Sequence, residues 1–162
     1  MYRVRVHIST QRLELVGADG VVIRTFPVST SSRGTGERAG SYCTPRGHHL
    51  IRAKIGAGVP ENTVFVKRRP TGELYSPALA NQFPGRDWIL TRILWLSGCE
   101  AGFNRLGDVD TMRRYIYIHG SPEEAIMGKP GSIGCVRMRN QDVMELFELV
   151  EAGTPVEIVA PR

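Results

Sequence analysis

The sequence predicts a mainly β fold with one late amphipathic helix and short helical turns. Three observations lead to this fold class. The 162 residues include 18 Gly and 10 Pro, which indicates many turns. Short segments with alternating apolar and polar residues recur along the chain. Only one segment, near the C-terminus, carries the apolar stripe of a helix. The length fits a single domain spanning residues 1–162.

The N-terminal part is predicted to consist of strands. Residues 2–8 alternate charged or polar side chains with apolar ones, as a half-buried strand does. Residues 11–16 and 21–28 form two further apolar runs, and the connection between them contains Asp19-Gly20. Asp-Gly between two such runs is typical of a tight hairpin.

The middle of the chain is less regular. Residues 29–47 are rich in Ser, Thr and Gly, and a loop of this length inside a compact domain is often functional. Residues 48–55 read as a strand and residues 63–67 as a short one. We expect residues 68–86 to form an irregular excursion that serves as a flap over a groove. Residues 87–95 are compatible with either strand or helix.

The segment before the main motif is expected to deliver a histidine. Asp110 can cap a short helical turn that runs through Arg114. Residues 115–118 are β-branched and aromatic throughout, which predicts a strand. His119 then stands at the end of this strand.

The predicted helix lies near the C-terminus. Its apolar positions follow the i, i+3, i+4, i+7 spacing and are Val143, Leu146, Phe147 and Val150. Asn140 is expected to cap the N-terminus of this helix and Gly153 to end it. Residues 155–159 close the chain with a strand.

Charge and composition exclude several classes of function. The formal net charge is +5, and the basic residues are scattered without an aromatic-rich basic stripe, which argues against a nucleic-acid partner. A mild positive field favours anionic small substrates. No apolar run is long enough to cross a bilayer, so no membrane partner is expected.

The expected location is the cytoplasm. The first eight residues show no apolar core of a signal peptide, and the three cysteines are an odd number, which favours a reducing compartment. A periplasmic location is the alternative if the natural protein begins upstream of this sequence.

The most informative residues are a Cys and a His near the end of the chain. His119-Gly120 is followed by Ser132-Ile133-Gly134-Cys135-Val136-Arg137-Met138. Cys with a positioned His is the minimum set for catalysis by a thiol nucleophile. We therefore expect Cys135 to be the nucleophile and His119 its base, with a neighbouring imidazolium lowering the thiol pKa.

The residues around this pair have candidate roles of their own. The amides of Gly134 and Cys135 are candidate donors to an oxyanion. The Gly120 carbonyl can hold the second ring nitrogen of His119 and fix its tautomer. Arg137 is expected on the same strand face as Cys135, where it either clamps a substrate carboxylate or braces the loop.

Other candidate residues are given structural roles. Cys43 and Cys99 are expected to be small buried residues and His7 to be structural. His48 and His49 are expected to be half-buried strand residues, with the alternative that one of them faces the site. Tyr117 and Trp95 can line the groove, although core packing suits both aromatic rings. The spacing of Cys and His does not match a zinc site, so neither a metal nor a cofactor is expected.

Together these residues resemble a known signature. His119-Gly120, followed by Ser132-x-Gly134-Cys135-x-Arg137-Met138, is similar to the motif of the L,D-transpeptidase (YkuD-type) family, including the sixteen positions from His to Cys. Thr44-Pro45-Arg46-Gly47 resembles an upstream turn of the family, and Pro27-Val28-Ser29-Thr30 the strand end before it. The resemblance extends from about residue 2 to residue 159.

The resemblance implies roles for individual residues. It assigns Cys135 as nucleophile, His119 as general base and Gly120 as the residue that orients the base. Ser132, Gly134 and Arg137 match other motif positions, and with Tyr117 they are the candidate oxyanion and substrate-binding residues. The implied fold is a mostly β sandwich.

Two positions depart from the family pattern. Ser121 stands where Thr is usual and keeps the hydroxyl, and Ile133 stands where many members carry a second His. Any role of that second imidazole is therefore removed in this chain.

The implied substrate is a peptidoglycan stem peptide or a soluble muropeptide. The family attacks the L-to-D bond between the third residue, usually diaminopimelate, and the terminal D-Ala, leaving a thioester. Transfer to water is L,D-carboxypeptidase activity in wall recycling, and this is the expected function. Transfer to an amine gives a 3–3 crosslink and is the alternative.

Two further alternatives remain open. One is a peptide-binding module without catalytic activity. The other is a papain-like protease, which is disfavoured because its Cys precedes its His in the chain. The oligomeric state is not predicted.

Overall fold

The computed structural model describes residues 1–160 of the chain. Its elements, in chain order, are β1 (Arg3–His7), β2 (Arg12–Val16), β3 (Val22–Ser29), β4 (Gly47–Ile55), β5 (Thr63–Val66), β6 (Arg69–Leu74), α1 (Pro77–Gln82), β7 (Ile89–Gly98), the 3₁₀ turn η1 (Gly107–Val109), β8 (Tyr117–Ser121), β9 (Val136–Arg139), α2 (Asn140–Leu149) and β10 (Pro155–Val159). No helix within the described range has both the length and the apolar character needed to cross a bilayer.

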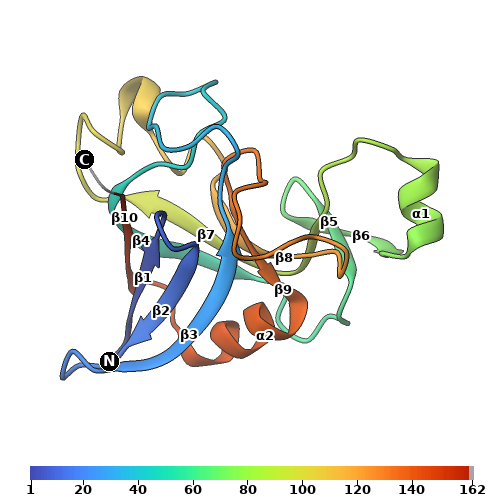
Figure 1. The fold of residues 1–162 in the computed structure, drawn as a ribbon, viewed down its shortest axis with the longest axis horizontal. Helices are drawn as coiled ribbons and strands as arrows, with labels where there is room; N and C mark the ends of the chain where they lie inside the picture. The colour runs from blue at the N-terminus through green and yellow to red at the C-terminus, as the bar shows by residue number, and fades with distance from the viewer. Residues whose placement is uncertain (161–162) are drawn as a thin grey trace.

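All ten strands belong to one continuous sheet in the order β4-β10-β1-β2-β3-β9-β8-β7-β5-β6. An additional pairing of β4 with β7 closes the sheet around the core, as Figure 1 shows. The pairs β1–β10 and β8–β9 are parallel, and the other pairs are antiparallel. The mainly β fold class is thereby confirmed. The two layers of the expected sandwich are opposite parts of one continuous sheet.

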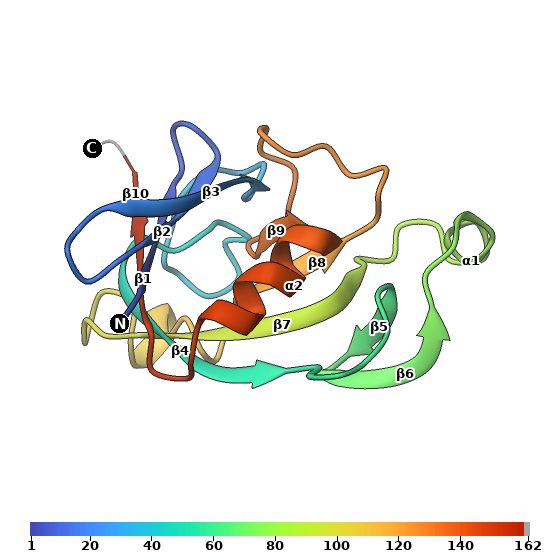
Figure 2. The same ribbon diagram turned by 90° about the horizontal axis from the view of Figure 1, so that it is seen from below.

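The helix α2 covers one side of this core. Val143, Leu146 and Phe147 are buried and belong to the main apolar cluster, and the helix packs on β7, β8 and β9 (Figure 2). The predicted apolar stripe is therefore correct. Because a parallel β8–β9 pair presents its apolar residues to the helix, the packing fixes the position of both strands that carry the site.

The predicted ends of this helix are wrong. Asn140 is its first residue rather than its cap, and the N-cap Arg139 makes no side-chain capping bond. The Asn140 amide is instead buried between two elements, where it accepts from the Thr91 hydroxyl at 2.7 Å and donates to Asn62 at 2.8 Å. The helix ends at Leu149, well before Gly153. The Asn140 side chain, which the local sequence assigns to capping, thus forms hydrogen bonds to distant elements instead.

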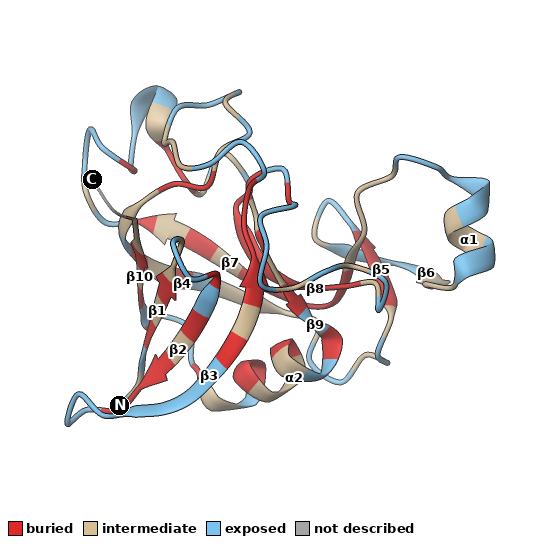
Figure 3. Ribbon diagram, in the orientation of Figure 1, coloured by how far each residue is buried: buried red, intermediate tan, exposed pale blue. Residues whose placement is uncertain are grey.

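The expected irregular excursion at residues 68–86 is also corrected. The segment contains strand β6 and helix α1, and the Ser76 side chain caps α1 by accepting from the Leu79 amide. Figure 3 shows α1 as a largely exposed arm that projects from the sheet, and none of its residues is buried. Short elements without an apolar face leave little periodic signal in a sequence.

Two boundaries near the site differ from the prediction. Residues 89–98 form the long strand β7, which resolves the open assignment at residues 87–95. The predicted strand at residues 115–118 begins only at Tyr117, because Tyr115 adopts a left-handed backbone with φ of 58°. His119 consequently lies in the middle of β8 rather than at its end. The Asp110 segment forms turns, in which the Asp110 carboxylate accepts from the Arg113 amide at 3.0 Å.

Candidate active site

The parallel β8–β9 pair places the predicted nucleophile and base on one side of the sheet. Ile118 pairs with Val136 and His119 pairs with Arg137, so Cys135 comes opposite Tyr117. Since side chains alternate along a strand, Cys135, Arg137, Tyr117 and His119 project from the same face. This is the arrangement expected for Arg137 and Cys135.

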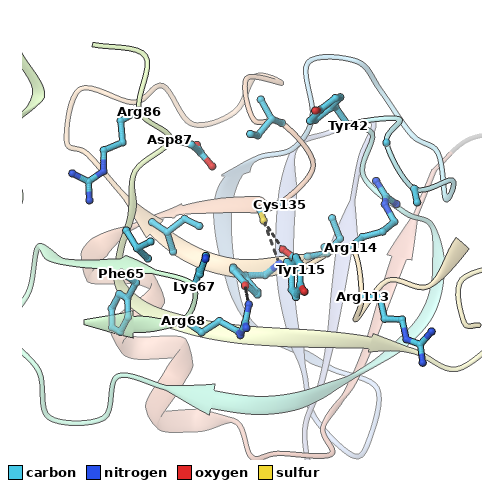
Figure 4. A pocket seen from close by; sticks show the side chains of 17 residues that line it. Tyr42, Phe65, Lys67, Arg68, Arg86, Asp87, Arg113, Arg114, Tyr115 and Cys135 are labelled. Atoms are coloured by element: carbon cyan, nitrogen blue, oxygen red, sulfur yellow. Dashed lines mark hydrogen bonds between the residues drawn. The ribbon is translucent and has the colours of Figure 1, made fainter. Parts of the chain in front are cut away.

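Cys135 opens into a cleft of about 1020 Å³. Figure 4 shows the sulfur near its centre, between Asp87 on one side and Arg114 with Tyr115 on the other. The basic side chains that line the cleft are Lys67, Arg68, Arg86, Arg113 and Arg114. Asp87 is the sole acidic residue among the described lining residues. The cleft is therefore strongly positive, which favours anionic ligands.

The thiol of Cys135 is held by backbone groups of β8 and the residues before it. It accepts from the Tyr117 N–H at 3.3 Å and donates to the Tyr115 carbonyl at 3.5 Å. The half-buried side chain packs beside Phe65, Ile93 and Tyr117. In this state the thiol proton points toward a carbonyl rather than toward the imidazole.

His119 is buried and oriented by its neighbour. Its Nδ1 lies 2.6 Å from the Gly120 carbonyl oxygen, the contact expected from the sequence. Because a carbonyl only accepts, Nδ1 carries the proton and Nε2 has a free lone pair. Among residues 1–160, no hydrogen-bond partner meets that buried Nε2. The tautomer is the one that a general base requires.

Gly120 is required at its position by close packing. A Cβ built there would lie 2.3 Å from the Asn140 Oδ1 atom and 2.6 Å from the Leu90 carbonyl oxygen. Any other residue would therefore displace β7 or α2 from β8. The same glycine supplies the carbonyl that orients His119, so packing and tautomer depend on one residue.

Both members of the pair are neutral in the free protein. Burial raises the pKa of the Cys135 thiol to about 12, with the Tyr117 amide opposing the shift in part. Burial also lowers the pKa of His119, and the nearby Asp87 carboxylate partly offsets that effect. The expectation that an imidazolium lowers the thiol pKa is therefore wrong for the free state, because desolvation outweighs the charges around it.

The turn before Cys135 is fixed by hydroxyl groups. Ser132 Oγ donates to the Cys135 carbonyl at 2.6 Å and accepts from the Gly134 N–H at 3.2 Å. Thr44 Oγ1 donates to the Gly134 carbonyl at 2.9 Å, which ties the turn to the 29–47 loop. Gly134 has φ of 135°, a conformation that other residues avoid. Because its amide already donates to Ser132, Gly134 is not a free oxyanion donor here, whereas that role stays a prediction for the Cys135 amide.

Arg137 makes bracing contacts. One guanidinium nitrogen donates to the Gly131 carbonyl at 3.0 Å, and another lies 3.1 Å from the Asp87 carboxylate. Arg137 thus links β9 to the connection between β8 and β9 and to Asp87, which lies two residues before β7. The alternative role as a carboxylate clamp stays a prediction.

Tyr117 is both a cleft residue and a packing residue. Its hydroxyl accepts from Arg68 at 2.9 Å, while its ring packs with Phe65 and Ile93. Trp95 does not line the cleft; its ring meets Tyr117 edge to face, lies tilted against Tyr115 and is covered by the Arg68 guanidinium. The packing role expected for both rings is therefore present.

The remaining candidates lie outside the cleft. His49 is buried, with one ring nitrogen beside the Gly47 carbonyl and the other beside the Thr111 hydroxyl, and burial lowers its pKa to about 4. His7 contacts Glu14 at the sheet surface, and His48 is exposed. Cys43 and Cys99 are free thiols, and the expected burial is wrong for both, because Cys43 is only half-buried and Cys99 is exposed. Within residues 1–160 no three His, Cys, Asp or Glu side chains are grouped as metal ligands.

Comparison with known proteins shows to which family this chain belongs. The model of the YkuD family, described as the L,D-transpeptidase catalytic domain, matches residues 1–158. The chain belongs to this family. Its members are cysteine-dependent enzymes of L,D-acyl transfer in peptidoglycan, and the resemblance read from the sequence is thereby confirmed.

Individual relatives agree over shorter stretches. The chain is 46% identical to the protein YkuD of Bacillus subtilis over 46 residues, which is 28% of each chain. It is 42% identical to YqjB of the same organism over 57 residues, or 35% of this chain and 31% of that protein. Less than a third of each relative is therefore matched.

Solved structures show the same fold. An L,D-transpeptidase from Mycobacterium smegmatis has a TM-score of 0.57 at 18% identity, with 98% of this chain and 58% of that chain covered. An Enterococcus faecium L,D-transpeptidase has a TM-score of 0.57 at 17% identity, with 98% and 49% covered. The chain spans about half the length of these proteins.

Several cleft residues were not singled out from the sequence. They are Asp87, Arg113, Arg114, Tyr115 and the turn residues Lys67 and Arg68. The pair Arg113-Arg114 and the run Lys67-Arg68-Arg69 are visible as charge clusters, but nothing in their spacing connects them to Cys135. The left-handed backbone of Tyr115 has no signal in the sequence, since tyrosine seldom adopts it.

Proposed function

We propose that the protein is an L,D-carboxypeptidase that removes the terminal D-Ala from peptidoglycan tetrapeptide stems through a Cys135 thioester. The observation that carries the proposal is the buried, unprotonated Nε2 of His119 on the same sheet face as the Cys135 thiol, beside a cationic cleft. A base with no other partner in the described chain is available to accept a thiol proton.

The reaction follows from these positions. A stem peptide in the cleft displaces water from Cys135, and the thiol proton passes to His119 Nε2 as sulfur attacks the carbonyl of the third residue. The C–N bond to D-Ala breaks, and Nε2 returns the proton to the departing amine. Water then attacks the thioester with His119 as base, and the protonated imidazole returns a proton to sulfur as the C–S bond breaks.

The charge of the cleft favours water as the acceptor. A crosslinking acceptor would bring an amine that is largely protonated at neutral pH into a cleft lined by five basic side chains. The single lining carboxylate, Asp87, is already paired with Arg137. Like charges repel the amine, whereas water is unaffected. Hydrolysis is therefore proposed ahead of 3–3 crosslinking.

The test is the mass of the products from one defined substrate. Purified protein is incubated with disaccharide tetrapeptide, with and without an excess of amine acceptor, beside a Cys135→Ala control. The proposal predicts disaccharide tripeptide plus free D-Ala in both incubations, and none with the control. Dimers lacking one D-Ala, formed without tripeptide, would establish the crosslinking alternative instead.

Labelling separates an enzyme from a peptide-binding module. Two similar solved structures are described as an avibactam carbamoyl enzyme and an imipenem complex. We expect a carbapenem to acylate Cys135 of this chain, with the mass shift absent in Cys135→Ala. If the thiol stays unmodified while tetrapeptide still binds, the non-catalytic module is the better description.

We also propose that the protein acts in the cytoplasm on soluble muropeptides. The odd number of cysteines supports a reducing compartment. Fractionation of cells that produce the natural protein, followed by immunoblotting, tests this. Recovery with the periplasmic or membrane fraction would contradict the location without affecting the chemistry.

A further inference from the structure

The turn between β5 and β6 has an unusual composition for its geometry. Val66 pairs with Arg69, so the connection consists of Lys67 and Arg68 alone, and both have positive φ, 50° and 64°. Two-residue hairpin turns with two left-handed residues strongly prefer Asn-Gly or Gly-Gly. Two long basic residues here cost conformational free energy. Strained positions of this kind are often retained for function.

The two side chains of this turn have different environments. The Arg68 guanidinium lies 4.7 Å from the ring centroids of both Trp95 and Tyr115, and it donates to the Tyr117 hydroxyl. Arg68 therefore anchors the turn to Trp95, Tyr115 and Tyr117. The backbone groups of the two tyrosines are the ones that contact the Cys135 thiol. Lys67 is exposed and lines the same cleft as Cys135 (Figure 4).

The ammonium group of Lys67 is not neutralised within the described chain. Two ion pairs occur at the cleft among residues 1–160, Arg86 with Glu73 and Arg137 with Asp87, and neither includes Lys67. Arg114 is held by the carbonyls of Gly36 and Cys43. Lys67 is thus an accessible cation at a fixed place in the cleft, which is the property of an anion-binding residue.

We propose that Lys67, held in place by Arg68, binds a carboxylate of the peptide substrate next to the bond that Cys135 attacks. This inference rests on the proposed function for the nature of the substrate. A tetrapeptide stem offers two such carboxylates, one on the departing D-Ala and one on the side chain of diaminopimelate. Lys67 is a specificity-determining residue, since it takes no part in bond making or breaking.

A purely structural role for the turn makes a different prediction. If Lys67 only closes the hairpin, its charge does not matter and Lys67→Gln binds peptides as the wild type does. Arg69 is the matched control, because it is an exposed cation of the same hairpin that does not line the cleft. Arg69→Gln removes the same charge one residue beyond the turn.

The experiment measures binding separately from turnover. Calorimetric Kd values are determined in a Cys135→Ala background for three synthetic tetrapeptides: the free acid with diaminopimelate, its C-terminal amide, and the free acid with Lys at position three. Each peptide is tested with Lys67, Lys67→Gln, Lys67→Arg and Arg69→Gln. Thermal melts of all variants check that the hairpin remains folded.

The proposal predicts that Lys67→Gln weakens binding of the free acid about three- to fivefold, as expected for an exposed ion pair. Lys67→Arg restores the affinity, and Arg69→Gln leaves it unchanged. The peptide whose affinity does not change with Lys67→Gln is the one that lacks the bound carboxylate, which identifies the source.

Three outcomes would overturn the proposal: unchanged Kd values in Lys67→Gln, equal losses for all three peptides, or the same loss in Arg69→Gln. Failure of the proposed function has a separate signature. Lys67-dependent binding without release of D-Ala by the unmodified protein would exclude the carboxypeptidase while retaining this carboxylate site.

Discussion

Cys135, directly before β9, and His119, in the parallel neighbour β8, project from the same face of the sheet, but no hydrogen bond joins them within residues 1–160. The thiol proton is directed to the Tyr115 carbonyl, and the Nε2 lone pair of His119 has no partner in residues 1–160. The free protein therefore holds a neutral thiol and a neutral imidazole on one face of the sheet. On substrate binding the S–H group must turn away from the Tyr115 carbonyl before its proton can pass to His119.

The first prediction concerns the reactivity of the free thiol. Because burial raises the pKa of Cys135 to about 12, alkylation by iodoacetamide should rise about tenfold per pH unit between pH 7 and 10 without a plateau. Stopped-time mass spectrometry of Cys135 checks this, with Cys43 as an internal comparison. A rate that is already constant above pH 6 would reveal a stable thiolate–imidazolium pair and contradict the neutral resting state.

Removal of either member of the pair should abolish turnover for different reasons. Cys135→Ala removes the nucleophile, so no thioester can form. His119→Ala removes the base, and kcat should fall by about 10²- to 10⁴-fold or more. Cys135→Ala should retain the melting temperature within a few degrees, because it removes a single sulfur atom from a half-buried side chain. Steady-state assays beside thermal melts test both statements. Substantial activity in His119→Ala would require another base.

The backbone at Gly134 should be essential for the site. With φ of 135°, Gly134→Ala costs about 1–3 kcal/mol and shifts the turn that presents Cys135. Activity should fall more than the melting temperature alone explains. Gly20→Ala is the control, since Gly20 has φ of 83°, has open space around a Cβ and lies in the β2–β3 turn. Equal activity losses in the two variants would point to general destabilisation.

Arg137 should act through stability rather than substrate affinity. Its bonds to Gly131 and Asp87 brace two connections, and the ion pair is partly exposed, so Arg137→Ala should cost about 1 kcal/mol. The melting temperature should fall while KM changes little. A large rise in KM with an unchanged melting temperature would show that the guanidinium clamps a carboxylate instead.

His49 should make the fold acid-sensitive. Burial lowers its pKa from the ordinary 6.5 to about 4, so the unfolded chain binds a proton first as the pH falls. Stability is therefore complete above pH 6.5 and is lost between pH 6.5 and 4, by about 3 kcal/mol at most. Urea unfolding across this range measures the effect. In His49→Gln the slope should shrink, and an unchanged slope would assign the acid sensitivity to other groups.

Local sequence patterns predict part of this fold. The hairpin at Asp19-Gly20 and the stripe of α2 follow from turn chemistry and periodicity, which act over a few residues. Asn140 shows the limit, because its amide bonds to Thr91 and Asn62 from distant elements. Long-range hydrogen bonds override a local capping preference, and no window of sequence contains them.

The candidate site divides in the same way. The sequence alone predicted Cys135 and His119 as catalytic partners, since both residues and their glycines lie within one motif whose chemistry needs few other groups. The tertiary structure decided that both groups are neutral and that Lys67 lines the cleft into which Cys135 opens. Burial, and the way in which β5, β8 and β9 come together, depend on strand register across the whole sheet. Many residues set this register together, so no short segment of the sequence predicts it.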